Sequence, residues 1–174
     1  MKSVLAGKSA SVLMVIAVVL LASSALADWP QLQGPNRDGS SPEKGLARAW
    51  PEKGPKVLWS FSLGAGYGSA AVRDGEVYIL DRVEDKQDVL RCLDLQTGKE
   101  LWNYAYDAPG TTSHNGSRTA PTVDDKYVFA VGMLGHFSCV DRKTHQAVWQ
   151  KNLVADFNVK APGWGVVQSP SIYK

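Results

Sequence analysis

The sequence predicts an all-β fold, a β-propeller of four-stranded antiparallel blades. The first supporting observation is a nine-residue phrase that occurs twice, as DLQTGKELW (Asp94–Trp102) and as DRKTHQAVW (Asp141–Trp149). The second is that short apolar runs, separated by turn residues, precede each phrase in the same order. A unit of four short strands that returns after about 40 to 50 residues is typical of a propeller blade.

The first complete unit is expected at residues 68–108. The run EVYILD is continuously apolar, as in a strand buried on both faces, whereas KELWNYAY mixes polar residues in, as an outer strand does. Arg-Asp-Gly and Leu-Gln-Thr-Gly supply the turn residues between strands. The four strands, A to D, are expected at 68–72, 76–81, 88–94 and 99–106.

A second blade is expected at 117–153, and a third begins at 167–174, because Val72, Val123 and Ile172 occupy matching positions. Residues 56–61 (KVLWSF) resemble an outer strand without the other three strands of its blade, after a Pro- and Gly-rich segment at 28–55. In a complete ring such a strand would join the last blade and close the circle. We therefore expect a partial propeller, a fragment whose remaining blades belong to a longer chain. The alternative is a two-blade unit that assembles with copies of itself.

The N-terminus has the features of a secretory signal peptide at residues 1–27. Two lysines precede an apolar run at Ser11–Ala22, and Ala25–Ala27 supplies small residues at a cleavage site. A membrane anchor is the alternative, but an apolar run of about 12 residues is short for a bilayer, which needs about 20. We expect an exported protein, periplasmic or extracellular, with no integral membrane segment after cleavage.

Charge gives no indication of a polyanionic partner. The formal net charge of the 174 residues is +2, and Lys2 and Lys8 of the expected leader account for it. The remainder carries equal numbers of acidic and basic residues without a basic run. Neither nucleic acid nor an anionic membrane surface is therefore an expected partner.

The repeated phrase predicts a turn followed by a packing tryptophan. Its carboxylate can accept hydrogen bonds from the backbone two or three residues on and from the threonine hydroxyl. Gly98 can adopt a positive φ, and His145, at the matching position, is among the few other residues enriched there. The tryptophans are expected to fill the gap between blades. A catalytic role for the aspartates is the alternative. The motif residues are Asp94, Thr97, Gly98 and Trp102 in the first copy and Asp141, Thr144 and Trp149 in the second.

The two cysteines, Cys92 and Cys139, both lie two residues before a repeat aspartate. Equivalent points on neighbouring blades lie about 10 Å or more apart, beyond the ~7 Å Cα limit for a disulfide. Both are therefore expected to be small, buried, apolar residues.

The phrase x-D-x-x-T-G-x-x-x-W resembles the pyrroloquinoline quinone (PQQ) repeat; LDLQTGKELW fits fully and VDRKTHQAVW departs only at the glycine. The resemblance implies a quinoprotein alcohol dehydrogenase-like propeller. The PQQ repeat is found in quinoprotein alcohol dehydrogenases, in the propeller lipoprotein of outer-membrane assembly, and in exported PQQ-like propellers of unassigned function. The opening ADWPQLQGPNRDGSSPEKGL looks most similar to the third group.

In the quinoprotein enzymes, the resemblance implies PQQ above a tryptophan floor, a Cys-Cys pair, a Ca²⁺ held by Glu, Asn and Asp, and an Asp base. This sequence has no Cys-Cys pair, and DRVEDKQD (Asp81–Asp88) lacks the spacing of a calcium loop and is interpreted as a solvated B-to-C loop. No catalytic, cofactor-binding or metal residue is assigned. PQQ and calcium are expected only if the full-length protein is an enzyme.

Any binding surface is expected where the B-to-C loops and the connections between blades open on one face. The candidates are His114, Asn115 and Arg118 in connection 107–118, and Lys160 and Trp164 in connection 154–166. We predict a noncatalytic binding or scaffold module for a protein or saccharide ligand. The alternatives are a fragment of a PQQ-dependent oxidoreductase, or loops in which Trp164 caps a blade and His114 is merely solvated.

Overall fold

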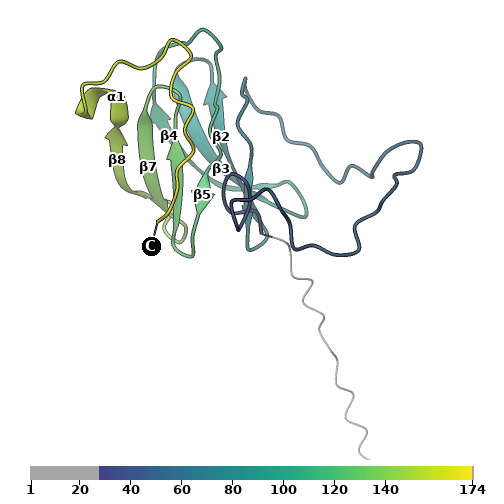
Figure 1. The fold of residues 1–174 in the computed structure, drawn as a ribbon. Coiled ribbons are helices and arrows are strands. Elements are labelled where there is room, and N and C mark those ends of the chain that lie inside the picture. The colour runs from purple at the N-terminus through teal and green to yellow at the C-terminus, as the bar shows by residue number, and fades with distance from the viewer. Residues whose placement is uncertain (1–27, 174) are drawn as a thin grey trace, which may run out of the picture.

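The computed structural model describes residues 28–173, so the predicted signal peptide lies outside the described residues, as does Lys174. The prediction of an all-β propeller fold is confirmed: eight strands form two four-stranded antiparallel sheets, each one blade (Figure 1). The first blade consists of β1 (Ala71–Arg73), β2 (Glu76–Val83), β3 (Gln87–Asp94) and β4 (Glu100–Asp107). The second consists of β5 (Thr122–Val123), β6 (Tyr127–Val131), β7 (His136–Asp141) and β8 (Ala147–Asn152).

Both blades have the same internal construction. Strands follow one another in chain order, β1 to β4 and β5 to β8. The register shifts once in each blade at the same place, between Cys92 and Leu93 in the first and between Cys139 and Val140 in the second. The sequence repeat is therefore also a repeat of backbone geometry, down to the irregularity that precedes the outer strand.

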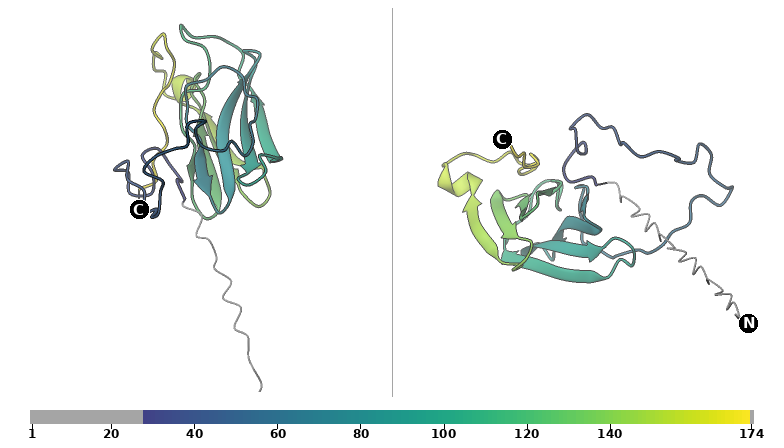
Figure 2. Two further views of the ribbon diagram at one scale, coloured as in Figure 1. Left: turned by 90° about the vertical axis from the view of Figure 1, so that its right-hand side faces the viewer. Right: turned by 90° about the horizontal axis from the view of Figure 1, so that it is seen from below.

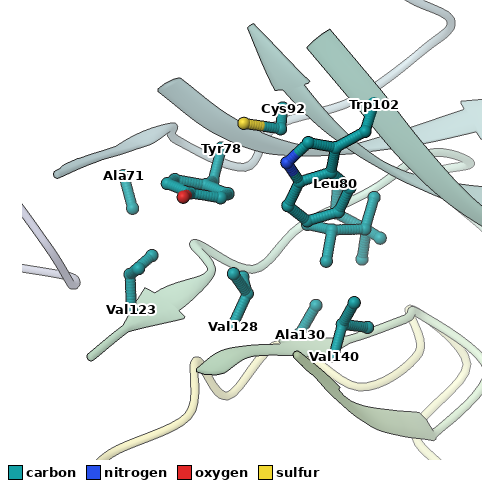
Figure 3. Close-up of a cluster of buried hydrophobic side chains, with 10 residues drawn as sticks. Ala71, Tyr78, Leu80, Cys92, Trp102, Val123, Val128, Ala130 and Val140 are labelled. Carbon is teal, nitrogen blue, oxygen red and sulfur yellow. The ribbon is translucent and has the colours of Figure 1, made fainter. Parts of the chain in front are cut away.

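The hydrophobic core lies between the two sheets. Figure 3 shows Tyr78, Cys92 and Trp102 of the first blade facing Val128 and Val140 of the second, with all five side chains buried. Because each sheet presents apolar residues to its neighbour, packing of one blade on the next removes this surface from water and supplies the main stabilising contribution.

The chain around the two blades contains no further strand among the described residues. Residues 56–61, predicted as an outer strand, form no strand, and they pair with no strand among the described residues. Residues 167–172 likewise form no strand, yet they run beside β5 (Figure 1). Ser169 Oγ accepts from the Ala120 N–H at 2.9 Å, and Thr122 Oγ1 donates to the Pro170 carbonyl at 2.7 Å.

The N-terminal segment lies against the inner edges of both blades before it swings away from them (Figure 2). Trp29 exchanges two backbone hydrogen bonds with Val72, of 2.8 and 2.9 Å, and the Val123 N–H donates to the Pro30 carbonyl at 2.8 Å. Gly34, at φ +77°, packs on the Trp29 ring so closely that a Cβ would lie 2.7 Å from it. This contact leaves no room for a side chain at position 34.

A short helix that the sequence did not indicate, α1 (Leu153–Asp156), follows β8 and is the only helix in residues 28–173. Asn152 caps it: the side-chain Oδ1 accepts from the backbone N–H groups of Val154 and Ala155, each at 3.0 Å. Within residues 28–173, no helix has the length and apolar character needed to cross a membrane.

Candidate functional site

The carboxylates of the repeat aspartates accept hydrogen bonds within their own turns. Asp94 Oδ1 accepts from Thr97 Oγ1 at 2.6 Å and from the Thr97 N–H at 2.7 Å. Asp141 Oδ1 accepts from the backbone N–H groups of Lys143 and Thr144, each at 2.8 Å. Hydrogen bonds from Thr97 and Thr144 lower the pKa of Asp94 and Asp141 respectively, because they stabilise the charged form. The geometry is that of a turn stabilised by the aspartate side chain.

Trp59 and Trp102 are each seated by the turn of the following blade. The Trp59 ring lies on Gly98, where a Cβ would come within 2.5 Å of it, and its Nε1 donates to the Leu95 carbonyl at 2.9 Å. Trp102 stacks on His145, with ring centroids 4.8 Å apart and planes inclined by 11°. The seat is a left-handed residue in both cases, at φ +70° in Gly98 and +61° in His145.

Trp149 has no such seat among the described residues. It contacts Phe137 and Phe129 of its own blade, with ring centroids 5.0 and 6.3 Å away, and 37% of its surface is exposed, against 8% for Trp102. The sequence predicted a tryptophan between blades but did not indicate that the partner lies in the next repeat, since that requires knowing how blades are stacked.

The interpretation of Asp81–Asp88 as a solvated loop is wrong. Only residues 84–86 separate β2 from β3, and the rest of this stretch belongs to the strands. The side chains of Arg82 and Asp88 are each 1% exposed and form an ion pair with an N–O distance of 3.0 Å. Asp81 is also buried and accepts from Arg91 Nε at 2.8 Å and from the Gly64 N–H at 2.8 Å. The charges face neighbouring segments of chain, which a one-dimensional pattern cannot reveal.

A second set of charges lies at the opposite end of the strands, and this set links the two blades. Arg142 follows the repeat aspartate of the second blade and reaches back to the first. Its guanidinium donates to Tyr78 Oη at 2.9 Å, to Asp74 at 2.9 Å and to Glu76 at 3.1 Å. Arg142 thus holds the two blades in register at this end.

The long connections meet at the other end, as expected of a loop face. The Gly110 N–H donates to the Asp85 carbonyl at 3.0 Å, which ties connection 107–118 to the β2–β3 turn. The Ser113 N–H donates to the Gly163 carbonyl at 3.0 Å, which ties it to connection 154–166. We call the surface formed by residues 84–86, 107–118 and 154–166 the loop face.

The five candidate residues occupy this face in different ways. His114 is exposed, with Nδ1 3.3 Å from Ser113 Oγ, whereas Asn115 is half-buried and donates to Asp85. Trp164 is 54% exposed. Lys160 is exposed and has neither a hydrogen bond nor an ion pair within the described part of the chain. The structure therefore ties the loop of His114 to the loop that carries both Lys160 and Trp164.

Arg118 differs from the other inward-facing arginines. Its guanidinium lies over the exposed ring of Tyr67, with Cζ 5.2 Å from the centroid, and its Nε and Nη2 are buried without a hydrogen-bond partner. No carboxylate lies within ion-pair distance of it in residues 28–173, while Arg82, Arg91 and Arg142 all have one. Sequence reasoning named Arg118 but did not name Tyr67.

The described residues do not fit a calcium site of the kind that the resemblance to quinoprotein enzymes implies. No three of their His, Cys, Asp and Glu side chains are grouped so that they could hold a metal ion. The inward-facing carboxylates of Asp81 and Asp88 are already paired with arginine. Cys92 and Cys139 are free and buried, and burial raises the pKa of their thiols to about 12 and about 11.

Comparison with known proteins places this geometry in a family. The sequence model PQQ_2, described as outer membrane protein assembly factor BamB, matches residues 43–167. The chain belongs to this family. The PQQ-repeat family match thus spans both blades and the connections that form the loop face, and the resemblance deduced from the repeated phrase is confirmed.

Relatives of this PQQ-repeat chain include enzymes. It is 28% identical over 120 residues to a 1-butanol dehydrogenase (cytochrome c) of Thauera butanivorans; the match covers 64% of this chain and 17% of that protein. The quinohemoprotein alcohol dehydrogenase of Comamonas testosteroni superposes with a TM-score of 0.59 at 18% identity, over 85% of this chain and 22% of that one. BamB of Moraxella catarrhalis gives a TM-score of 0.42 at 22% identity, over 55% and 27% of the two chains. The chain therefore spans about a fifth of the length of these dehydrogenases.

Proposed function

We propose that this chain is an exported, noncatalytic propeller module that binds a protein ligand through the loop face. The observation that carries the proposal is the unpaired guanidinium of Arg118. A half-buried guanidinium with two buried nitrogens that lack acceptors is costly, and Arg82, Arg91 and Arg142 have carboxylate partners. A ligand that brings a carboxylate to Arg118 would remove this cost, so we expect an acidic group at the point of contact.

Apolar side chains on the same face favour a polypeptide as the ligand. Phe157, Val159 and Trp164 are all exposed in one connection, and Tyr67 is exposed beneath Arg118. Trp, Tyr and Arg are the residue types enriched at the energetic centres of protein–protein interfaces. The description of the matched family as an outer membrane protein assembly factor is in keeping with action on proteins. A saccharide is the competing ligand class.

The test uses the full chain and a fluorescein-labelled peptide of alternating Glu and Leu, with fluorescence anisotropy as the readout. We expect saturable binding that weakens about tenfold or more in Arg118→Gln, the size of effect that loss of one charged hydrogen-bonded contact has. Trp164→Ala should weaken it independently. Arg48→Gln, which removes an exposed charge outside the loop face, is the matched control. Equal affinity for the Glu peptide and its Gln counterpart would contradict the proposal, and binding of oligosaccharides alone would assign the face to the other ligand class.

A second candidate function is that of a quinoprotein-type oxidoreductase of alcohols, formed with blades outside this chain. The 28% identity to a 1-butanol dehydrogenase favours it. The described residues supply no ligand set for calcium, and no step of such a reaction is assigned to them. Titration of the protein with PQQ and Ca²⁺ separates the two candidates: a quinone absorbance on the protein with dye-linked alcohol oxidation supports the enzyme. Absence of both signals, together with peptide binding, supports the module.

A further inference from the structure

His136 and Asn152 form a hydrogen-bonded pair next to the loop face. His136 is the first residue of β7 and Asn152 the last residue of β8, directly opposite in the sheet. His136 Nε2 lies 3.3 Å from Asn152 Nδ2. The Oδ1 of the same amide accepts the two N–H groups that begin α1.

This arrangement fixes the protonation state of the imidazole. A primary amide offers acceptors only at its oxygen and donors only at its nitrogen. Because capping of α1 uses Oδ1, the atom turned to His136 is the donor Nδ2, so Nε2 has to be the acceptor. His136 is therefore neutral here, with its proton on Nδ1, which is buried and has no hydrogen-bond partner among the described residues.

Protonation of His136 is incompatible with this arrangement. The imidazolium carries an N–H at both ring nitrogens, so Nε2–H would point at the N–H of the amide. The conflict is removed if the Asn152 amide turns over and offers Oδ1 to the imidazolium. Nδ2 then faces the N–H groups of Val154 and Ala155, and the cap of α1 is lost.

We propose that His136 is a proton-operated switch for connection 154–166: the neutral ring keeps α1 capped through Asn152, and the protonated ring uncaps it. The connection is tied to the β6–β7 turn by two backbone bonds of 2.8 Å, Leu153 N–H to the Gly135 carbonyl and Val166 N–H to the Met133 carbonyl. Between these ties, the segment that carries Phe157 and Trp164 is held by the capped turn and by the Ser113–Gly163 hydrogen bond.

The groups around His136 set the direction of the pH dependence. Burial is the largest influence and lowers the pKa of His136; Arg82 lowers it further, while the carboxylate of Asp88 opposes both. The Tyr106 ring packs on the imidazole with centroids 5.3 Å apart, and burial raises the pKa of Tyr106, so it stays neutral. From α1, Asp156 accepts from the Asn152 N–H at 3.1 Å. The capped state is thus fully present above about pH 6.5, the ordinary histidine value, and is lost as the pH falls through the lowered pKa of His136.

The test is NMR of the full chain from pH 8 to 4.5, following the His136 ring carbons and the exchange rates of the Val154 and Ala155 amides. Beyond the intrinsic pH effect on exchange, we expect protection of both amides to fall about five- to tenfold, as expected for loss of an N-cap. Its midpoint should coincide with the titration of His136. His114→Gln, which removes an exposed histidine of the neighbouring loop, should leave the response unchanged.

Two substitutions distinguish the switch from general acid destabilisation. In His136→Gln the pH response should disappear. In Asn152→Asp the new carboxylate can cap α1 and accept from the imidazolium at once, so protection should persist or increase at low pH. Amides of Val154 and Ala155 that stay protected while wild-type His136 titrates would overturn the proposal, and so would an unchanged response in Asn152→Asp. None of these readouts depends on ligand binding.

Discussion

Replacement of Trp102 by alanine should destabilise the fold far more than the same replacement of Trp149. Both residues occupy the same position of the repeat, but Trp102 is 8% exposed and is seated on His145, while Trp149 is 37% exposed. The pair therefore compares a wedge between two blades with the same wedge on an uncovered sheet face.

The magnitude follows from buried area. A tryptophan buries up to about 250 Å², so Trp102 removes about 230 Å² and Trp149 about 160 Å² from water. At about 25 cal/mol per Å² these areas correspond to about 6 and 4 kcal/mol, which are upper estimates. Measured losses for large-to-alanine changes in cores are about 3–5 kcal/mol, and the stacked contact contributes about 1 kcal/mol more at Trp102. We expect a loss of about 4 kcal/mol for Trp102→Ala and about 2 kcal/mol for Trp149→Ala.

Urea unfolding followed by far-ultraviolet circular dichroism measures both losses, with the slope of free energy against urea checked for constancy. Equal losses in the two variants would refute the argument, because they would mean that contact with the following blade adds nothing. A loss below about 1 kcal/mol for Trp102→Ala would refute the claim that the core lies between the blades.

Three further outcomes follow from the structure. Gly98→Ala should lower the free energy of unfolding by about 1–2 kcal/mol in the same urea assay, because a side chain at φ +70° is strained and its Cβ would overlap a tryptophan ring; an unchanged midpoint would contradict the seat. Asp88→Asn should lower the free energy of unfolding by about 3–5 kcal/mol, because the buried guanidinium of Arg82 loses its counter-charge. A loss near zero would contradict burial of this ion pair. Cys92 and Cys139, with pKa values raised to about 12 and about 11, should react with a thiol reagent at pH 8 only as fast as the protein unfolds; prompt labelling of native protein would show otherwise.

Local order was predictable from the sequence because it depends on neighbouring residues. The alternation of strand and turn, the Asp–Thr turn and the positive φ of His145 all follow from residues within one repeat. The same reasoning failed at Asp81–Asp88, where a charged run that resembles a surface loop is largely strand with buried ion pairs. Polar residues can be buried when their partners come from other segments, and those partners are not adjacent in sequence.

The candidate site was only partly predictable for the same reason. The sequence indicated which connections would share a face, and it named Arg118 and Trp164 because long connections between strands carry exposed polar and aromatic residues. It did not indicate that Arg118 lacks a carboxylate while the other inward-facing arginines have one. Nor did it pair His136 with Asn152, since that pairing depends on the register of β7 and β8.

The sequence by itself determined the architecture: a repeated turn-and-tryptophan phrase, written once per blade, specifies four short strands and an apolar face on each side. Only the tertiary structure decided which residues of one blade contact the next blade. The seats of Trp59 and Trp102 lie in the next repeat along the chain, and Arg142 reaches back across the interface between the two blades. The strand pattern is set by interactions between near neighbours in the chain, whereas the charge partners are set by which surfaces meet when the blades stack.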